Sequence, residues 1–520
     1  MRSCGERLMR VFLASRRGML VANIAVAVVF VAVTVAMRGL TLQVWHPFNA
    51  DEAELMAQAH AAERSILPFT TWTMGTTGPV WPMFLAVLGH FGYPLTIASA
   101  HLLAAILTGI MGFLVWILMR RVLGNAMGLW VAVMMWLPLA LIYPVGPWAD
   151  FGALTTELLP CVLVLSAALF RPASLALRPW LFAPVGLLCG LAVGSKYQVV
   201  PVAGALLIAQ LIATHQSRPR TLLASAWWVA GAATPFAIIA IALVISPSVS
   251  LDLVRQNLSF LFAYAGKLDF RSRVANFAWQ FSRQLYVVLV LILLARLSAL
   301  SSRRVVITRI GLALSGFVAV AAGGMRFPHY LWLLYIALVL AAAQPMREGA
   351  VLLPWAGVRR ARRASAAAAI VGLLGVIVFG IASDRLVFAG SGTVRASLSV
   401  DSVNRDPFVA AECPAGSHVL VWGWAAELYV YYSWENTVPF MNTLGLRSTP
   451  ENLSAVRPIV SKGIANANCV VDASGSPFFG ANKAASLELV YPEFTVVLSK
   501  EFTKRRGVLN CPSCTFYVRN

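Results

Sequence analysis

Long apolar runs recur along the chain from residue 19 to about residue 382, and most of them contain about 17 to 25 residues. A hydrocarbon core of roughly 30 Å needs about 20 helical residues to cross it. Inside lipid, each backbone amide must find its hydrogen-bond partner within its own segment, whereas a β-barrel would show alternation over roughly ten residues. The runs therefore predict an α-helical polytopic membrane protein.

Arginine clusters indicate which ends of the predicted helices face the cytoplasm. The net charge is +20, and the arginines gather in short clusters between the apolar runs rather than in a stripe with interleaved aromatic residues. This pattern is typical of cytoplasmic loops and does not indicate a nucleic-acid partner. With the N-terminus in the cytoplasm, the clusters fit about eleven transmembrane helices, over 19–37, 94–118, 126–142, 152–170, 180–194, 198–214, 222–246, 284–300, 310–324, 330–344 and 364–382.

Two parts of the chain fall outside this series. Segment 79–92 is apolar but short and contains two prolines, so we expect a helix that lies at the outer interface or re-enters the membrane. After about residue 390 the chain becomes polar, and short runs typical of strands follow at 418–424, 469–474, 494–499 and 514–519. We therefore expect a transmembrane domain, residues 1–390, and a small α/β domain, residues 391–520, which an odd number of helices places outside the cytoplasm.

The cysteines agree with that placement. Four of the seven cysteines lie in the polar C-terminal part, at Cys413, Cys469, Cys511 and Cys514. Four cysteines allow three pairings, and an oxidising compartment favours disulfides over a zinc site. The "CPSC" pair at residues 511–514 resembles a redox CxxC motif, but no thioredoxin-like strand and helix frame it. We predict disulfides, with the pairing left open.

Carboxylates are concentrated directly after the first predicted helix. The stretch "NADEAELMAQA", residues 49–59, holds Asp51, Glu52 and Glu54 in a chain with only 21 acidic residues. A solvated first helical turn would explain this stretch by itself, because acids interact favourably with the helix dipole. It would not explain why most acids up to residue 390 fall on the predicted outer face: Asp51, Glu52, Glu54, Glu63, Asp150, Glu157, Asp252, Asp269 and Asp384.

Cations are expected at the same face. Lys196 lies in "GSKYQVV" between two apolar runs, and Arg326 and His329 lie in "GGMRFPHYLWL". An ionisable residue at membrane depth costs a few kcal/mol on insertion scales, so it is a functional candidate by default. Other readings stay open: an amine that snorkels to the interface would explain Lys196, Arg326 and His329 could be an ordinary loop pair, and Glu157 could cap or pair within the bundle.

Carboxylates and cations at an outer membrane face suit a lipid-linked donor with a phosphate leaving group. A carboxylate can take the proton from an attacking hydroxyl, while a cation offsets the charge that develops on the departing phosphate. Asp51 is the candidate base, because it starts a helix-like run and has apolar residues around it that can hold it in place.

Four stretches together resemble one known family. They are "NADEAELMAQA", "TTGPVWPMFLAVLG", "GSKYQVVP" and "GGMRFPHYLWLLYIALVLAAA", and they occur in this order between residues 15 and 345. The chain is similar in these stretches to the bacterial branch of glycosyltransferase family 39, a group of GT-C membrane enzymes related to protein O-mannosyltransferases and to the lipid A aminoarabinose transferase. The family's donors are polyprenyl-phosphate sugars, and transfer inverts the anomeric centre.

The resemblance implies roles for particular residues. Asp51 matches the family's catalytic carboxylate, with Glu52 beside it; Lys196, Arg326 and His329 match residues expected at the donor phosphate. Further candidates for substrate binding are Asp150, Glu157, Tyr197 and Tyr330. The chain departs from the family at "TGPVW", where "HPPLY" is common. Because that histidine is missing, we assign no metal ligand, and a divalent cation stays open as a cofactor.

The sequence thus predicts an inverting glycosyltransferase of the bacterial inner membrane, which moves a hexose or pentose from a polyprenyl phosphate to a lipid, glycan or protein acceptor outside the cytoplasm. A polytopic transporter or flippase of a lipid-linked glycan is the alternative from another class. A transporter would show paired charges near the midplane of the membrane and two related halves. A third reading is a non-catalytic assembly scaffold, in which Lys196 and the acids of residues 49–59 could be replaced without loss of function. The outer segment 247–283 is either a lid or acceptor surface or a solvated loop.

Overall fold

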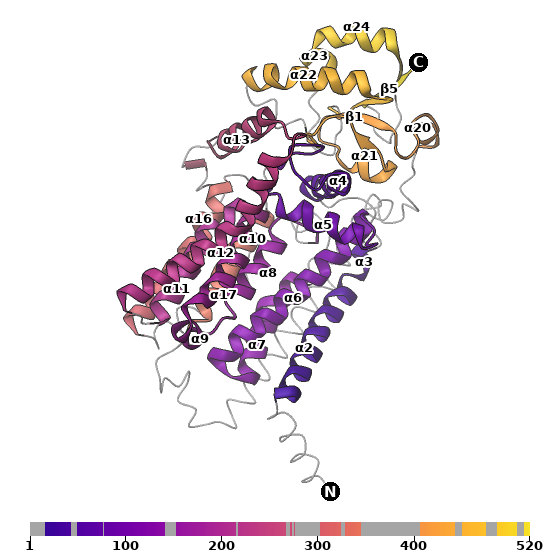
Figure 1. Ribbon diagram of the computed structural model, residues 1–520. Coiled ribbons are helices and arrows are strands. Elements are labelled where there is room, and N and C mark those ends of the chain that lie inside the picture. Colours follow the sequence, from indigo (N-terminus) through magenta and orange to yellow (C-terminus); the bar gives the residue numbers. More distant parts are fainter. Residues whose placement is uncertain are drawn as a thin grey trace.

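The computed structural model describes residues 16–42, 49–75, 77–140, 152–214, 217–266, 271–272, 275, 302–323, 328–344, 406–442, 450–474, 486–506 and 514–520. A bundle of apolar helices carries a C-terminal α/β region, residues 406–520, at one end (Figure 1). Helix α2 (Arg16–Met37) runs along the bundle from the far end toward this region.

Five described helices are long and apolar enough to cross a membrane: α2, α6 (Ile97–Leu123), α11 (Val200–Thr214) with the preceding turn η3 (Tyr197–Val199), α12 (Arg218–Ile245) and α16 (Arg303–Gly323). Shorter apolar helices lie between them: α5 (Val80–His90), α7 (Asn125–Ala140), α8 (Leu158–Ala167), α10 (Phe182–Ser195), which follows the turn η2 (Pro179–Leu181), and α17 (Leu331–Ala342). The remaining α-helices among the described residues before the C-terminal region are α3 (Gly39–Leu42), α4 (Ala50–Arg64), α9 (Pro172–Leu177) and α13 (Leu251–Gly266).

The five long helices and the shorter α7, α8, α10 and α17 overlap predicted apolar spans, with ends that differ by up to seven residues, whereas α3, α4, α9 and α13 lie outside those spans. The predicted spans 284–300 and 364–382 lie outside the described residues, so the number of about eleven spans stays a prediction. Segment 79–92 forms only the short helix α5, which lies with α4 at the end of the bundle next to the C-terminal region (Figure 1).

Small residues let the helices approach closely. A Cβ atom on Gly186 would lie 2.0 Å from the carbonyl oxygen of Trp228, and one on Gly190 would lie 2.3 Å from that of Ala232. Helices α10 and α12 therefore touch through their backbones, as is common where lipid supplies no hydrophobic driving force. Helix α17 lies in the middle of the bundle, since all 12 of its residues are buried.

The C-terminal region contains a five-stranded sheet in the order β2-β1-β3-β5-β4. The strands are β1 (His418–Trp422), β2 (Glu435–Asn436), β3 (Cys469–Asp472), β4 (Phe502–Arg506) and β5 (Thr515–Arg519). Strands β2, β1 and β3 are parallel, whereas β5 pairs antiparallel with both β3 and β4. Helices α20 (Pro407–Glu412), α21 (Glu427–Tyr432), α22 (Pro450–Asn466), α23 (Leu487–Val490) and α24 (Pro492–Glu501) pack around it (Figure 1).

One predicted strand is wrong. The run 494–499, "FTVVLS", belongs to helix α24. Pro492 occupies the first turn of this helix, where its missing N–H costs nothing, and Phe494 and Leu498, four residues apart, are buried while Val496 is 54% exposed. Packing of one helical face therefore overrides the β propensity of the two valines.

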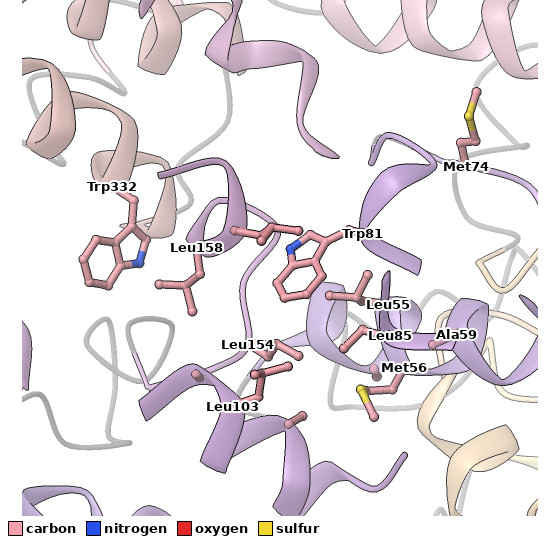
Figure 2. Close-up of a cluster of buried hydrophobic side chains, with 14 of the residues drawn as sticks. Leu55, Met56, Ala59, Met74, Trp81, Leu85, Leu103, Leu154, Leu158 and Trp332 are labelled. Atoms are coloured by element: carbon pink, nitrogen blue, oxygen red, sulfur yellow. The ribbon is translucent and has the colours of Figure 1, made fainter. Parts of the chain in front are cut away.

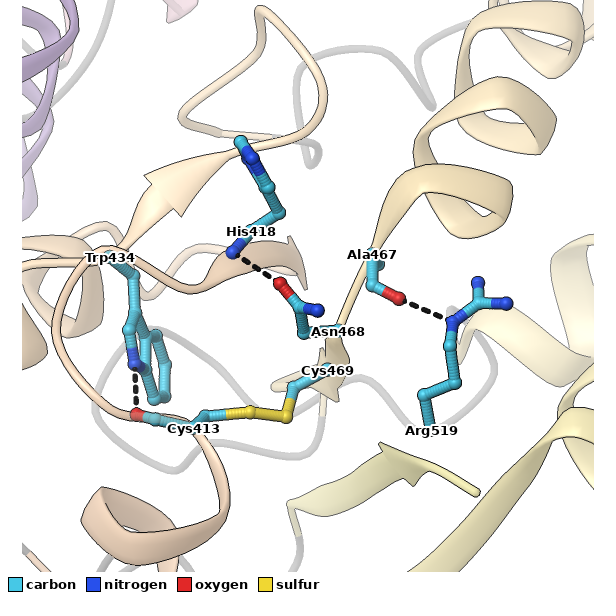
Figure 3. Close-up of a disulfide and its surroundings, with 7 residues drawn as sticks. All are labelled: Cys413, His418, Trp434, Ala467, Asn468, Cys469 and Arg519. Carbon is cyan, nitrogen blue, oxygen red and sulfur yellow. Dashed lines mark hydrogen bonds between the residues drawn. A yellow bond between two sulfur atoms is a disulfide. The ribbon is translucent and has the colours of Figure 1, made fainter.

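A disulfide joins two of the four candidate cysteines, Cys413 and Cys469 (Figure 3). The bond ties the end of α20 to the start of β3, 56 residues further along the chain. Cys514 is also disulfide-bonded, and Cys511 lies outside the described residues. The remaining described cysteines, Cys161 and Cys189, are free and buried in the helical bundle.

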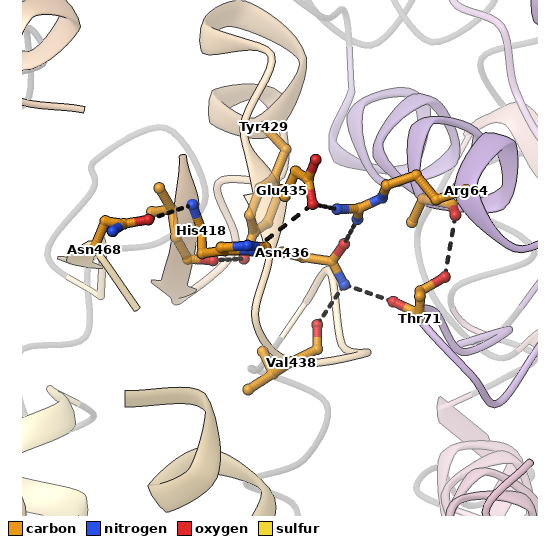
Figure 4. Close-up of polar contacts among 10 residues, drawn as sticks. Arg64, Thr71, His418, Tyr429, Glu435, Asn436, Val438 and Asn468 are labelled. Carbon is orange, nitrogen blue, oxygen red and sulfur yellow. Dashed lines mark hydrogen bonds and ion pairs between the residues drawn. The ribbon is translucent and has the colours of Figure 1, made fainter. Parts of the chain in front are cut away.

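The C-terminal region rests on helix α4 and the loop that follows it. Arg64 at the end of α4 forms an ion pair with Glu435 at 2.6 Å and donates a hydrogen bond to the side chain of Asn436 (Figure 4). The Asn436 amide in turn donates to the carbonyl oxygen of Thr71 at 2.6 Å, and the Thr73 N–H donates to that of Pro439 at 2.9 Å. Side chains and backbone thus both fix the two parts against each other.

Candidate active site

Helix α4 presents the acidic stretch. Asn49 caps its first turn, because the side-chain oxygen accepts a hydrogen bond from the Glu52 N–H at 2.8 Å. The apolar side of α4, with Leu55, Met56 and Ala59, packs into a cluster that also contains Leu85 of α5 and Leu103 of α6 (Figure 2). The helix that carries the carboxylates is therefore held rigidly at the end of the bundle.

The two acids predicted to act together point to different neighbours. Glu52 is fully buried: one carboxylate oxygen accepts a hydrogen bond from the Leu154 N–H at 2.7 Å, and the other lies 3.1 Å from Nε2 of His101 on α6. These contacts suit a residue that anchors α4 and the segment before α8. Asp51 keeps one fifth of its side chain exposed, so of the two it is the one that a substrate can reach.

Asp51 lies beside a histidine from the far end of the sequence. Its Oδ2 atom is 3.3 Å from Nε2 of His329, in the turn η4 (Pro328–Tyr330) that leads into α17. Burial acts to raise the pKa of Asp51, but the hydrogen bond and charge of His329, together with the charge of Lys196, lower the pKa below its ordinary value. Asp51 is therefore held as a carboxylate.

Lys196 ends helix α10 inside the protein. Its Nζ atom is 3.2 Å from Oε1 of Glu157, and both side chains are almost completely buried. The same ammonium lies 5.3 Å from the ring centre of Tyr330, which stands edge-on to the ring of His329. A chain of contacts thus runs from Glu157 through Lys196, Tyr330 and His329 to Asp51, and it joins α8, α10, η4 and α4.

The "TTGPVW" segment is fixed against the lysine turn. The Gly78 N–H donates a hydrogen bond to the carbonyl oxygen of Ser195 at 3.1 Å. A Cβ atom on Gly78 would lie only 1.9 Å from the carbonyl oxygen of Gly194, so no other residue fits here without movement of the backbone. The loop after α4 and the residue before Lys196 therefore hold each other in place.

The other predicted site residues have different contacts or lie outside the described part. The hydroxyl of Tyr197 contacts Sδ of Met74 at 3.6 Å, so this side chain points to the loop after α4. Asp150 and Arg326 lie outside the described residues. Within the described part of the chain, no group of three or more His, Cys, Asp or Glu side chains is arranged to hold a metal ion.

The sequence gives Glu54 no role beyond that of one acid among several on the predicted outer face. Its Oε1 atom accepts a hydrogen bond from Gln58 at 3.2 Å, and its Oε2 atom accepts one from Asn442 of the C-terminal region at 3.3 Å. Burial and the nearby charge of Asp51 raise the pKa of Glu54 to about 7. His101 was also missed; a single histidine inside an apolar run was the available signal.

Comparison with known proteins gives a structural likeness alone. No family model matches the chain, and no curated protein matches it. Among solved structures, the chain is similar to ArnT from Cupriavidus metallidurans, whose crystal structure was determined bound to undecaprenyl phosphate. The TM-score is 0.52 at 15% sequence identity, and the match covers 97% of this chain and 98% of that one.

The chain shares the fold of ArnT, since the likeness extends over almost the full length of both proteins. This likeness and the five apolar helices of membrane-spanning length agree with the predicted helical membrane protein. Membership of the GT-C enzymes and of glycosyltransferase family 39 stays a prediction.

Proposed function

We propose that this protein is an inverting glycosyltransferase that moves one sugar from a polyprenyl-phosphate donor to a hydroxyl of a lipid, glycan or protein acceptor. The observation that carries the proposal is the chain of contacts from Lys196 to Asp51, at the end of an apolar bundle. A buried ammonium suits a phosphate, and a neighbouring carboxylate that is held ionised suits an attacking hydroxyl. The shared fold with a protein that binds undecaprenyl phosphate supports the same donor class.

The proposed reaction is a single displacement. Asp51 accepts the proton from the acceptor hydroxyl as the acceptor oxygen bonds to the anomeric carbon. The bond from that carbon to the phosphate oxygen breaks, its electron pair stays on the phosphate, and Lys196 and His329 offset the new charge. The isoprenoid tail of the donor stays in the bilayer beside the apolar helices.

The proposed function also requires a membrane and an orientation for the chain. We place the bundle in the bacterial inner membrane, with the N-terminus in the cytoplasm and with Asp51, Lys196 and the C-terminal region on the outer side. The arginine clusters of the loops support this direction.

Turnover of a labelled donor tests the function. Purified protein in lipid would be incubated with undecaprenyl-phosphate sugars that carry a radiolabelled hexose or pentose, together with a membrane extract as the acceptor source. A transferase releases undecaprenyl phosphate and moves the label to a new product. Recovery of the intact donor on the opposite side of a vesicle membrane would instead establish a transporter.

A further inference from the structure

Glu54 is a further carboxylate on helix α4, three residues after the proposed base. Asp51 and Glu54 are three residues apart in the helix, so their side chains lie on neighbouring positions of one face. Their partners differ in charge. Asp51 lies against His329 and within reach of the charge of Lys196, whereas the hydrogen-bond donors to Glu54 are the neutral amides of Gln58 and Asn442.

Two hydrogen bonds hold the Glu54 carboxyl group, one from its own helix and one from the C-terminal region, and the loop after α4 approaches it closely. Gln58 reaches it from the next turn of α4, and Asn442 reaches it from the C-terminal region, 388 residues away in sequence. The loop after α4 approaches through Gly75, whose φ of 55° favours glycine and where a Cβ atom would lie 2.6 Å from Oε1 of Glu54. The Gly75 N–H is itself held by the side chain of Asn257 on α13 at 3.1 Å. Such a position is too well defined for a solvated helix-turn charge.

The charges around the two acids separate their affinities for a proton. Glu54 faces the charges of Asp51 on its own helix and Lys196 at the end of α10, while Gln58, Asn442, Asn257 and the Gly75 backbone are uncharged. Burial and Asp51 raise the pKa of Glu54 to about 7, and the pKa of Asp51 is lowered. Two acids whose pKa values are driven apart in one site are typical of acid and base roles that differ.

We infer that Glu54 is a second catalytic carboxylate, which receives the acceptor proton from Asp51, and that Asn442 of the C-terminal region is its positioning residue. This rests on the proposed function. The acceptor O–H bond breaks and the proton passes to Asp51 as the glycosidic bond forms and the donor phosphate departs. The proton then moves from Asp51 to Glu54, which restores the Asp51 carboxylate for the next turnover and finally releases the proton to solvent.

Glu54 must be ionised to receive the proton, so activity should depend on its titration. We expect the wild-type kcat/KM for the labelled undecaprenyl-phosphate sugar to rise with pH through about 7. Glu54→Gln keeps the shape of the side chain but cannot take a proton. In this variant kcat/KM should therefore be about 10²-fold lower and should no longer rise with pH through about 7. Glu63→Gln is the matched control, since Glu63 lies on the same helix and is one third exposed. This variant should keep the wild-type rate and the wild-type pH dependence.

Asn442 gives a test that leaves Glu54 in place. Its hydrogen bond lowers the pKa of Glu54, so Asn442→Ala should move the rising limb to higher pH, whereas Asn466→Ala, at an exposed position of α22, should not. A purely structural role of Asn442 would lower the rate equally at every pH, and that result would overturn its assignment.

A measurement without turnover separates this inference from the proposed function. Between the ordinary value of 4.5 and the folded value of about 7, folded protein keeps a proton on Glu54 that unfolded protein has lost, so wild-type stability falls as pH rises through this range. Residue 54 does not titrate in Glu54→Gln. The thermal midpoint of this variant should therefore rise relative to that of wild type as the pH is raised from about 5 to about 8. An unchanged difference would overturn the inference, as would wild-type turnover with an unaltered pH profile in Glu54→Gln. Absence of wild-type turnover would count against the proposed function instead.

Discussion

The buried ion pair of Lys196 and Glu157 allows structure and function to be tested separately. At a separation of 3.2 Å, two unit charges attract each other by about 5 kcal/mol when the effective dielectric constant is about 20. Glu157→Leu removes the carboxylate and leaves a buried ammonium without this partner. Because breaking one half of such a pair costs about 3 to 5 kcal/mol, we expect a clear loss of thermal stability in lipid or detergent.

The double variant Glu157→Leu/Lys196→Met removes both charges. Replacement of a buried pair by apolar side chains of similar volume is often neutral, so most of the lost stability should return. Donor turnover should not return, since the proposed phosphate ligand is absent. Lys462→Met, at an exposed position of α22, is the control for removal of a lysine. The reasoning fails if the double variant is no more stable than Glu157→Leu, or if it is stable and transfers the sugar at the wild-type rate.

Two further predictions concern the scaffold around the site. In Gly78→Ala the new Cβ would lie 1.9 Å from the carbonyl oxygen of Gly194, so we expect a loss of about 1 to 3 kcal/mol and reduced turnover, while Gly204→Ala, with open space around it, should keep the wild-type thermal midpoint. Replacing Cys413 and Cys469 by serine opens a loop of 56 residues, which should destabilise the C-terminal region by about 4 kcal/mol on the chain-entropy model; equal thermal midpoints with and without a reducing agent would show that this bond contributes nothing.

The sequence predicted the helical bundle, and it named several residues of the candidate site that the structure brings together, because both leave local signals. An apolar run of sufficient length has one economical structure in lipid, and "GSKYQVV" and "RFPHY" each place an ionisable residue between two such runs. The structure brings Lys196, His329 and Asp51 into one chain of contacts, as those positions indicated. Glu52 is different, because its burial against His101 depends on how α4 packs on α6.

The remaining features depend on contacts between distant segments. Nothing near Asn442 in the sequence indicates that its amide meets Glu54, 388 residues earlier, and Glu54 itself looks like any charged residue of an exposed helix. The strand predicted at 494–499 failed for a related reason, since the buried face of α24 is set by what it packs against. Hydrophobic periodicity and charge patterns therefore located most helices and strands. The pKa values of the acids in the candidate site could not be predicted in this way, because they depend on how these helices and loops pack together.

The central claim is that Asp51 acts as a base on the acceptor hydroxyl, whereas other residues, Lys196 among them, bind the phosphate of the donor. Its most direct test compares wild type with Asp51→Asn for release of undecaprenyl phosphate from the labelled sugar donor, with binding of undecaprenyl phosphate itself measured on both proteins by native mass spectrometry. We predict that Asp51→Asn binds this lipid as wild type does and releases none from the donor. Undiminished release by Asp51→Asn would contradict the account.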